Sequence, residues 1–284
     1  MMKILWRLGA LGPSVVGSTL LVSLVVAPAL PTLAQVGLFY GGLLVMVLLV
    51  CGVGEGRAVR VLFHSRRLTA SEQSALAPIT VELCRRGLGP PVIEIFVAKR
   101  PAAAPACVQG RRHVVLAPWF VYAVRSGQLP HDETVAVIAH AALVTQAGLS
   151  RHDPAIAFWT LPWRTMCTIA RPLRGLLPDF VWKARFVVFA VAIWQSATMG
   201  PPVVGPISAA VLAIILASTY LSPVCARHWQ RHVARVADNG LVGLGLGPAM
   251  TKFLRRYPLI GELEARLGVL EPTARPTSRL RPVQ

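Results

Sequence analysis

Acidic residues are scarce in this chain of 284 residues: Asp and Glu number 12 against 29 Lys and Arg, which gives a formal net charge of +17. Charged residues of both signs make up only 14% of the sequence, whereas hydrophobic residues make up 54%. So few charges exclude an ordinary soluble domain, in which about a quarter of the residues are charged. A nucleic-acid binder of similar charge would rarely contain long uncharged tracts, so we expect no nucleic-acid partner. The composition is typical of an integral membrane protein with basic faces on one side of the bilayer.

Paired cysteines are also missing. The sequence has five scattered cysteines and no C-x-x-C pair: Cys51, Cys84, Cys107, Cys167 and Cys225. This spacing excludes a disulfide framework and a thiolate metal site of the usual kind. We expect reduced, mostly buried cysteines in cytoplasmic and membrane surroundings.

Two tracts lack any Asp, Glu, Lys or Arg, from Leu8 to Gly54 and from Phe186 to Ala226. Each is longer than the roughly 20 residues that one transmembrane helix needs, and each is interrupted near its middle by prolines. Each tract therefore predicts two membrane-spanning helices joined by a tight hairpin. The four predicted spans are Pro13–Ala27, Val36–Val53, Phe180–Met199 and Ile207–Val224.

The distribution of basic residues predicts the orientation in the membrane. Both hairpin turns lack Lys and Arg, whereas Lys3, Arg7, residues 55–185 and the C-terminal part hold all 29 of them. The positive-inside rule then places both termini and the large middle segment in the cytoplasm, and we expect a multi-pass protein of the plasma membrane. An alternative is that the N-terminus is a cleaved signal peptide ending near Ala34; the apolar run that restarts at Val36 argues against this.

The segment between the hairpins carries signals for helices and strands. Thr69-Ala70-Ser71-Glu72 is a capping box, and it predicts a helix up to Gly87. Residues 92–97 alternate and are rich in β-branched residues, which predicts a strand; a second strand is predicted over 113–116, after a loop over 99–110. Short helices are predicted over 118–124, where Pro118 suits a first helical position, and over 132–148. We expect a mainly helical α+β domain.

The helix over 132–148 contains one of the three functional residues of a metal-binding motif. Its central residues are Ala139-His140-Ala141-Ala142-Leu143-Val144. In an H-E-x-x-H helix, two histidines four residues apart bind zinc, and the glutamate after the first activates water. Here His140 is the only one of these three residues present, since Ala141 cannot accept a proton and Val144 cannot bind a metal.

Several stretches in this order resemble the HtpX-like and CAAX-prenyl-protease group of membrane zinc metallopeptidases. They include residues 67–72, 83–91, 110–116 and 135–148 and, after the second hairpin, Arg231-His232-Val233-Ala234-Arg235-Val236-Ala237-Asp238, where the family reads Arg-x-x-Glu-x-x-Ala-Asp. The resemblance covers about Leu68 to Tyr257 and the two hairpins. It implies a gluzincin-like fold and a third zinc ligand at the position of Ala234.

Carried over residue by residue, the family pattern leaves only one zinc ligand, His140. The other ligand positions hold Val144 and Ala234, and the general-base position holds Ala141. A catalytic zinc needs about three protein ligands and an open water position. We therefore expect no cofactor and no catalytic residue. Zinc is expected only if a site is rebuilt, for which His113, His131 and His152 lie in or beside loops that could approach His140, whereas helical geometry directs His228 and His232 away from the position of Ala234.

Arg227, Arg231 and Arg235 recur every four residues just after the fourth predicted span. This stripe has two interpretations: it binds anionic lipid headgroups or an acidic partner, or it is an ordinary solvated face. Lipid bilayer and a membrane-protein client or complex are the expected partners.

These observations divide the chain into five expected parts: an N-terminal transmembrane hairpin (1–54), a cytoplasmic peptidase-like domain (55–179), a second hairpin (180–226), a C-terminal helical part of that domain (227–271) and a disordered tail (272–284). The expected function is that of a non-catalytic pseudopeptidase that binds membrane or unfolded protein segments. Two alternatives are an active zinc metalloendopeptidase with noncanonical ligands in membrane-protein quality control, and a structural component of a membrane complex.

Overall fold

The structure, a computed structural model, describes residues 2–89, 93–176, 179–199, 204–258 and 263–270. The predicted disordered tail lies outside these residues. The chain divides into two compact units, one formed by residues 1–46 and 156–231 and the other by residues 47–155 and 232–284.

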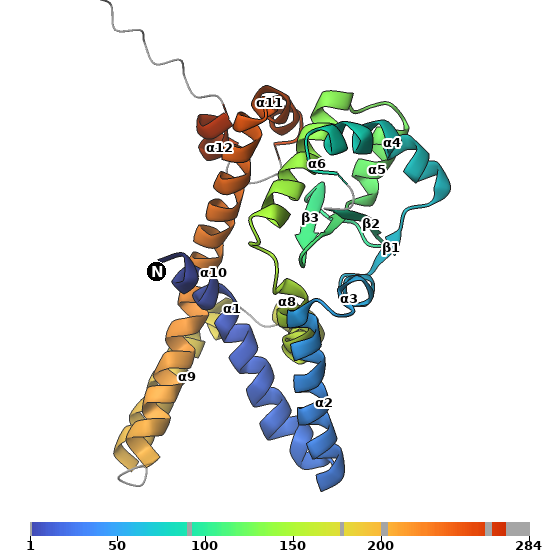
Figure 1. Ribbon diagram of the computed structural model, residues 1–284. Helices are drawn as coiled ribbons and strands as arrows, with labels where there is room; N and C mark the ends of the chain where they lie inside the picture. The colour runs from blue at the N-terminus through green and yellow to red at the C-terminus, as the bar shows by residue number, and fades with distance from the viewer. Residues whose placement is uncertain (1, 90–92, 177–178, 200–203, 259–262, 271–284) are drawn as a thin grey trace, which may run out of the picture. The chain divides into compact units, whose positions relative to one another are not determined.

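The first unit is helical (Figure 1). Its helices are α1 (Met2–Leu21), most of α2 (Thr32–Cys51), α8 (Leu161–Leu176), α9 (Asp179–Met199) and the larger part of α10 (Val204–Gly243). A π-turn (Val22–Val26) and a 3₁₀ turn (Ala27–Ala29) follow α1, so the helix is interrupted near Pro28 as predicted, whereas Pro13 lies inside α1. Helix α7 (Asp153–Trp159) precedes α8.

Two helices near the N-terminus are long and apolar enough to cross a membrane, Ile4–Leu21 in α1 and Thr32–Cys51. The second agrees with the predicted span Val36–Val53, whereas the first begins nine residues before the predicted span Pro13–Ala27 and overlaps it only from Pro13 to Leu21. Both support the interpretation as a membrane protein. Two segments of α10, Gly205–Ser218 and Tyr220–Gly243, meet the same requirement only when taken together. The four-span arrangement as a whole therefore stays a prediction.

Small and polar residues of α1 contact the tryptophans of α7 and α8. The indole of Trp159 donates a hydrogen bond to Thr19 Oγ1 at 3.0 Å, and the backbone N–H of Trp163 donates to Ser18 Oγ at 3.2 Å. A Cβ atom at Gly17 would lie 2.8 Å from the Trp163 ring, so only glycine lets the two helices approach this closely. These contacts fix the face of α1 that packs within the unit.

The second unit is built on a four-stranded sheet with the order β1-β2-β4-β3. Its strands are β1 (Ser65–Arg67), β2 (Glu94–Ala98), β3 (Ala106–Gln109) and β4 (His113–Leu116). The pair β2–β4 is parallel, and the outer pairs are antiparallel. Strand β4 is buried at every position, which is expected for a central strand covered on both faces.

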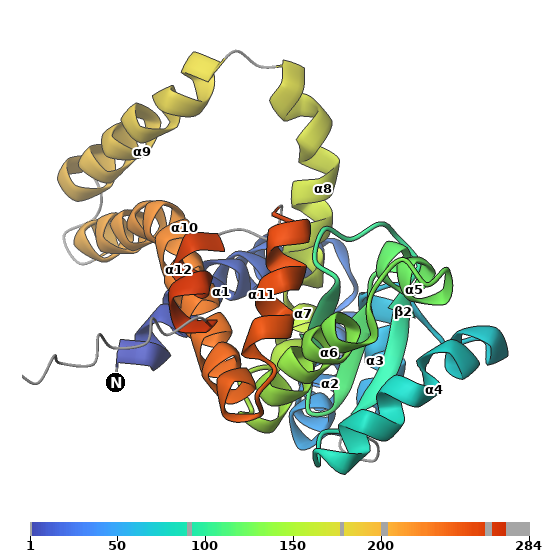
Figure 2. The same cartoon turned by 90° about the horizontal axis from the view of Figure 1, so that it is seen from above.

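Helices α4 (Ala70–Arg85), α5 (Pro118–Arg125), α6 (His131–Gln146) and α11 (Gly247–Arg256) form one core with the sheet, and α11 lies beside α6 (Figure 2). Eleven of the sixteen residues of α6 are buried, so it is the central helix of this unit. Helix α3 (Glu55–Leu62) connects α2 to β1, and α12 (Leu263–Leu270) follows α11.

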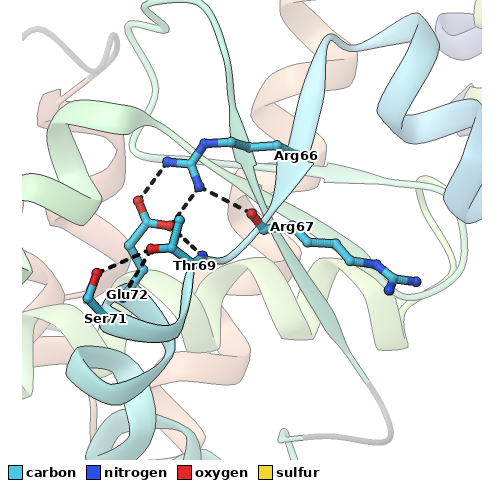
Figure 3. Close-up of polar contacts among 5 residues, drawn as sticks. All are labelled: Arg66, Arg67, Thr69, Ser71 and Glu72. Atoms are coloured by element: carbon cyan, nitrogen blue, oxygen red, sulfur yellow. Dashed lines mark hydrogen bonds and ion pairs between the residues drawn. The ribbon is translucent and has the colours of Figure 1, made fainter.

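The capping box predicted at the start of α4 is confirmed. Thr69 Oγ1 accepts a hydrogen bond from the backbone N–H of Glu72, and Glu72 accepts one from the backbone N–H of Thr69. The guanidinium of Arg66 also donates two hydrogen bonds to Glu72, at 2.7 and 2.6 Å (Figure 3). This pairing with Arg66 lowers the pKa of Glu72 to about 2.

The elements of the middle segment are largely as predicted. The strand over 113–116 and the helix that begins at Pro118 are confirmed, and the described part of the strand over 92–97 belongs to β2. The loop expected over 99–110 is partly wrong, because residues 106–109 form β3 in a hairpin with β4. The cysteines are free, as expected, but four of the five are exposed and Cys225 is half-buried, so the expectation of burial is wrong.

Candidate functional site

His140 lies on the third turn of α6 and is only partly accessible. Its side chain is 19% exposed, whereas the residues on either side of it, Ala139 and Ala141, are buried in the core. Helix α6 begins after Pro130 with acidic residues in its first turn, which favour a helix N-terminus. The helix therefore holds the imidazole at the edge of the core.

The imidazole of His140 faces a buried ion pair. Its Nε2 atom lies 3.3 Å from Oδ1 of Asp238 on α10, and the side chain of Asp238 is 1% exposed. Arg266 on α12 donates two hydrogen bonds to the same carboxylate, at 2.9 Å from Nε and 2.6 Å from Nη2. We call these three residues the His140–Asp238–Arg266 network; it joins α6, α10 and α12.

Electrostatics favours a neutral His140. Burial lowers the pKa of this imidazole, and the positive charge of Arg266 lowers it further. Asp238 and the backbone of Ala234 act in the opposite direction without reversing the shift. Nε2 is buried and makes no well-aligned hydrogen bond, so its contact with Asp238 is electrostatic.

The three positions that matter most in the resembling family hold apolar side chains here. Ala141 is 2% exposed and Val144 is 5% exposed, both within the packed interior. Ala234 is half-buried on α10, and its backbone approaches the ring of His140. The structure thus brings residues 140 and 234 together, but the side chain at 234 offers no metal ligand.

The residues around His140 do not fit a zinc ion. One imidazole nitrogen and one carboxylate fall short of the three ligands that a catalytic zinc needs. The carboxylate of Asp238 is already bound to the guanidinium of Arg266, whose positive charge would repel a metal ion at this position. Among the described residues, no group of three His, Cys, Asp or Glu side chains is placed to hold a metal.

Two of the other histidines have partners of their own. His113 on β4 lies 3.7 Å from Glu55 of α3 and 3.5 Å from Glu94 of β2. His228 stacks on Trp6 of α1, with ring centroids 5.2 Å apart.

The predicted basic stripe, Arg227, Arg231 and Arg235, is exposed along α10. Beside it, the guanidinium of Arg7 lies 5.4 Å from the ring centroid of Trp229. Cationic and aromatic side chains of this kind are typical of a membrane–water interface. The exposure of the stripe leaves both of its interpretations open.

The sequence pointed to His140 and to the motif position of Asp238, but not to Arg266. Residues 263–270 carry no motif, and a single arginine in a basic chain gives no signal of its own. Asp238, the one acidic residue in the sequence of α10, was the available clue, because a buried carboxylate requires a partner.

No family model matches the chain, and no curated protein or solved structure matches it significantly. The resemblance to the membrane metallopeptidases therefore stays a prediction that rests on the motifs and their order.

Proposed function

We propose that this chain is a membrane-embedded, metallopeptidase-like protein without catalytic activity, whose function is to bind membrane or unfolded protein segments. The observation that carries the proposal is the set of side chains at the positions where the resembling family binds zinc. Apolar side chains occupy positions 141, 144 and 234, and the acidic residue nearest to His140 is neutralised by Arg266. This arrangement supplies neither a metal site nor a general base.

An apolar cavity supports the binding part of the proposal. A cavity of about 800 Å³ in the first unit is lined by α1, α8 and α10, including Gly12, Val16, Trp163 and Ile214. Its walls are almost entirely apolar, and a Cβ at Gly12 would meet no atom within 4 Å, so this glycine faces open space. A transmembrane segment of a client protein matches this chemistry.

The proposal includes four spans, with both termini and the middle domain in the cytoplasm. The two apolar N-terminal helices and the uncharged predicted hairpin turns support it. A topology reporter fused at Leu33 or Val203 should be external, and one fused at Arg111 or Gln284 should be cytoplasmic. A cytoplasmic signal at Val203 would refute the four-span arrangement.

Zinc content tests the absence of catalysis. We expect detergent-purified protein to contain no stoichiometric zinc and to show no casein cleavage that is sensitive to phenanthroline. The His140→Ala variant is the control, since it removes the one remaining motif ligand. Cleavage that both phenanthroline and His140→Ala abolish would show that the chain is an active zinc endopeptidase.

Photocrosslinking tests client binding. A photoreactive residue at Val16, which lines the cavity, should crosslink to a polypeptide in membranes of the native host. The matched control is the same residue at Leu33, which is 88% exposed and does not line the cavity. Lipid adducts alone at Val16, or equal polypeptide adducts at both positions, would contradict a client-binding role and favour a purely structural one.

A further inference from the structure

A polar pocket lies directly after α2, the more apolar of the two candidate membrane-spanning helices. It has a volume of about 460 Å³, and its wall begins at Gly52, the residue that follows the last residue of α2. The wall continues through Gly56, which is five residues from Cys51 and thus at most about 18 Å along the chain. We call this cavity the α2-end pocket; if α2 spans the bilayer, chain continuity places the pocket at the membrane–water interface.

Positive charge dominates the lining of the α2-end pocket. Four arginines line it: Arg57, Arg60, Arg67 and Arg112. Only two carboxylates do so, Glu55 and Glu94, which leaves a net charge of four minus two, or +2. Burial lowers the pKa of the His113 imidazole, which also lines the pocket, so this residue adds no charge at neutral pH.

Two acidic residues near the pocket, Glu72 and Glu55, pair with arginines that do not line it, so these carboxylates do not occupy the pocket arginines. Glu72 pairs with Arg66, whereas the side chain of Arg67 extends away from that pair (Figure 3). Successive side chains of a strand point to opposite faces, so β1 places one arginine on Glu72 and the next one in the pocket. Glu55 is paired as well, with Arg111, which does not line the pocket.

Contacts with Arg111 hold the Glu55 side chain in the wall of the pocket and form a joint between α3 and the turn that precedes β4. The Glu55 side chain is 4% exposed; Oε2 accepts a hydrogen bond from the backbone N–H of Arg111 at 3.2 Å, and the Arg111 guanidinium also donates to the carbonyl of Val50 at 2.8 Å. Glycines allow this joint: a Cβ at Gly52 would lie 3.0 Å from Arg111 Nε, and a Cβ at Gly110 would lie 3.0 Å from Glu55 Oε2. Both glycines have positive φ, at 91° and 75°.

Three buried polar atoms in and beside this pocket make no hydrogen bond. His113 is 4% exposed, and its Nδ1 lies 3.7 Å from Glu55 Oε2 without forming a hydrogen bond. Glu55 Oε1 and Arg111 Nε are also buried without a hydrogen bond, although they lie 3.6 Å apart and form an ion pair with each other. The polar wall of the pocket is therefore not fully hydrogen-bonded within the protein, as a site for a polar ligand requires.

We propose that the α2-end pocket binds a phosphate group, and that an anionic lipid headgroup supplies this group. Arginine is well suited to phosphate, because its planar guanidinium donates two parallel hydrogen bonds to the oxygens. No side chain caps the N-terminus of α3 at Gly54, so the partial positive charge of this helix end adds to the field in the pocket. The proposal does not depend on the metallopeptidase resemblance.

The test uses full-length protein in detergent, and the probes are short-chain phosphatidylglycerol, short-chain phosphatidylcholine and inorganic phosphate at 0.15 M salt (about physiological ionic strength). A rise in melting temperature with ligand concentration reports binding to the folded state. We expect phosphatidylglycerol to raise the melting temperature and phosphatidylcholine, whose headgroup is zwitterionic, to have little effect. Competition by inorganic phosphate would support recognition of the phosphate itself; binding of inorganic phosphate alone would support the pocket but refute the lipid as its source.

Matched variants separate the pocket from general charge. Arg57→Gln combined with Arg67→Gln removes two pocket charges, and both residues are exposed, so the fold should tolerate the change. Arg100→Gln combined with Arg125→Gln removes two exposed charges that do not line the pocket. We expect the first pair to weaken phosphatidylglycerol binding about tenfold or more and the second pair to change it less than twofold, because only the first removes guanidinium–phosphate hydrogen bonds. Equal effects of the two pairs, or no binding by the unchanged protein, would overturn the proposal.

Discussion

Removing Arg266 should destabilise the second unit strongly at pH 7 and only weakly at pH 5. The change Arg266→Met keeps the apolar stem of the side chain and deletes the guanidinium. It leaves the carboxylate of Asp238, which is 1% exposed, with the imidazole of His140 at 3.3 Å as its remaining partner. Breaking a buried pair in this way costs about 3–5 kcal/mol.

Protonation of Asp238 limits this cost. A buried carboxylate without a partner can bind a proton, and from an unfolded pKa of about 3.9 this costs about 4 kcal/mol at pH 7 and about 1.5 kcal/mol at pH 5. The loss of unfolding free energy should therefore be about 3–4 kcal/mol at pH 7 and no more than about 1.5 kcal/mol at pH 5. Removing both partners, as Asp238→Asn with Arg266→Met, should cost much less than the single change at pH 7, because no charge stays buried.

Chemical denaturation of the detergent-solubilised protein, followed by tryptophan fluorescence at both pH values, measures these differences. The control is Arg66→Met, which breaks the partly exposed pair with Glu72; the Arg66 side chain is 38% exposed. Solvent screens such a pair, so we expect a loss of no more than about 1 kcal/mol. If Arg266→Met costs the same at pH 5 and pH 7, or no more than Arg66→Met, the network is not the buried ion pair described above.

Two further predictions concern titration. Burial lowers the pKa values of His140 and His113 below the unfolded value of 6.5, so the folded state binds fewer protons than the unfolded state. The stability that these residues contribute is therefore complete above pH 6.5 and is lost as the pH falls below 6.5. Melting temperatures between pH 8 and 5 should show this fall, and His140→Gln should reduce its slope. Glu133 lies 3.1 Å from Arg256, but burial raises the pKa of its carboxyl above the unfolded value of 4.5. Its contribution to the stability of the folded state is therefore present below pH 4.5 and is lost as the pH rises through the folded pKa. Glu133→Gln should therefore leave the melting temperature at pH 7 unchanged or higher, and a large decrease would mean that the pair with Arg256 outweighs burial.

Local signals in the sequence were sufficient for much of the second unit. The capping box at Thr69, the first-turn proline at Pro118 and the alternation over 92–97 act through neighbouring residues, so their elements could be predicted. Strand β3 could not, because residues 106–109 become a strand only by pairing with β4. Strand β1 is similar: its three residues are two arginines and a serine, and its partner β2 begins 27 positions after it ends.

The candidate site shows the same division between local and distant information. The spacing of His140 to Val144 and of Arg231 to Asp238 follows from helical periodicity, so the sequence could predict which positions share a face. The partner of Asp238 could not be predicted, since Arg266 lies 28 residues further along the chain on another helix. The α2-end pocket was missed for the same reason: it draws on α3 and three strands, and in a chain with net charge +17 no single arginine in it is distinctive.

Arg266 also determines how the metallopeptidase resemblance can be tested. Combining Ala141→Glu, Val144→His and Ala234→Glu restores the family's base and its two missing ligands beside His140. Residues 140 and 234 are already neighbours, and Val144 follows His140 by one turn of α6.

The restored glutamate at 234 would stand one turn before Asp238 on α10, within the field of the Arg266 guanidinium. This cation would compete with zinc for both carboxylates. The triple variant should therefore bind zinc weakly, and adding Arg266→Met should give stoichiometric binding with a higher melting temperature in zinc. Single substitutions should fail, because one added ligand leaves the coordination incomplete and places a polar group in an apolar interior. A well-folded variant with all four changes that binds no zinc would mean that positions 140, 144 and 234 do not converge, and the proposed descent of this site from a metallopeptidase would be wrong.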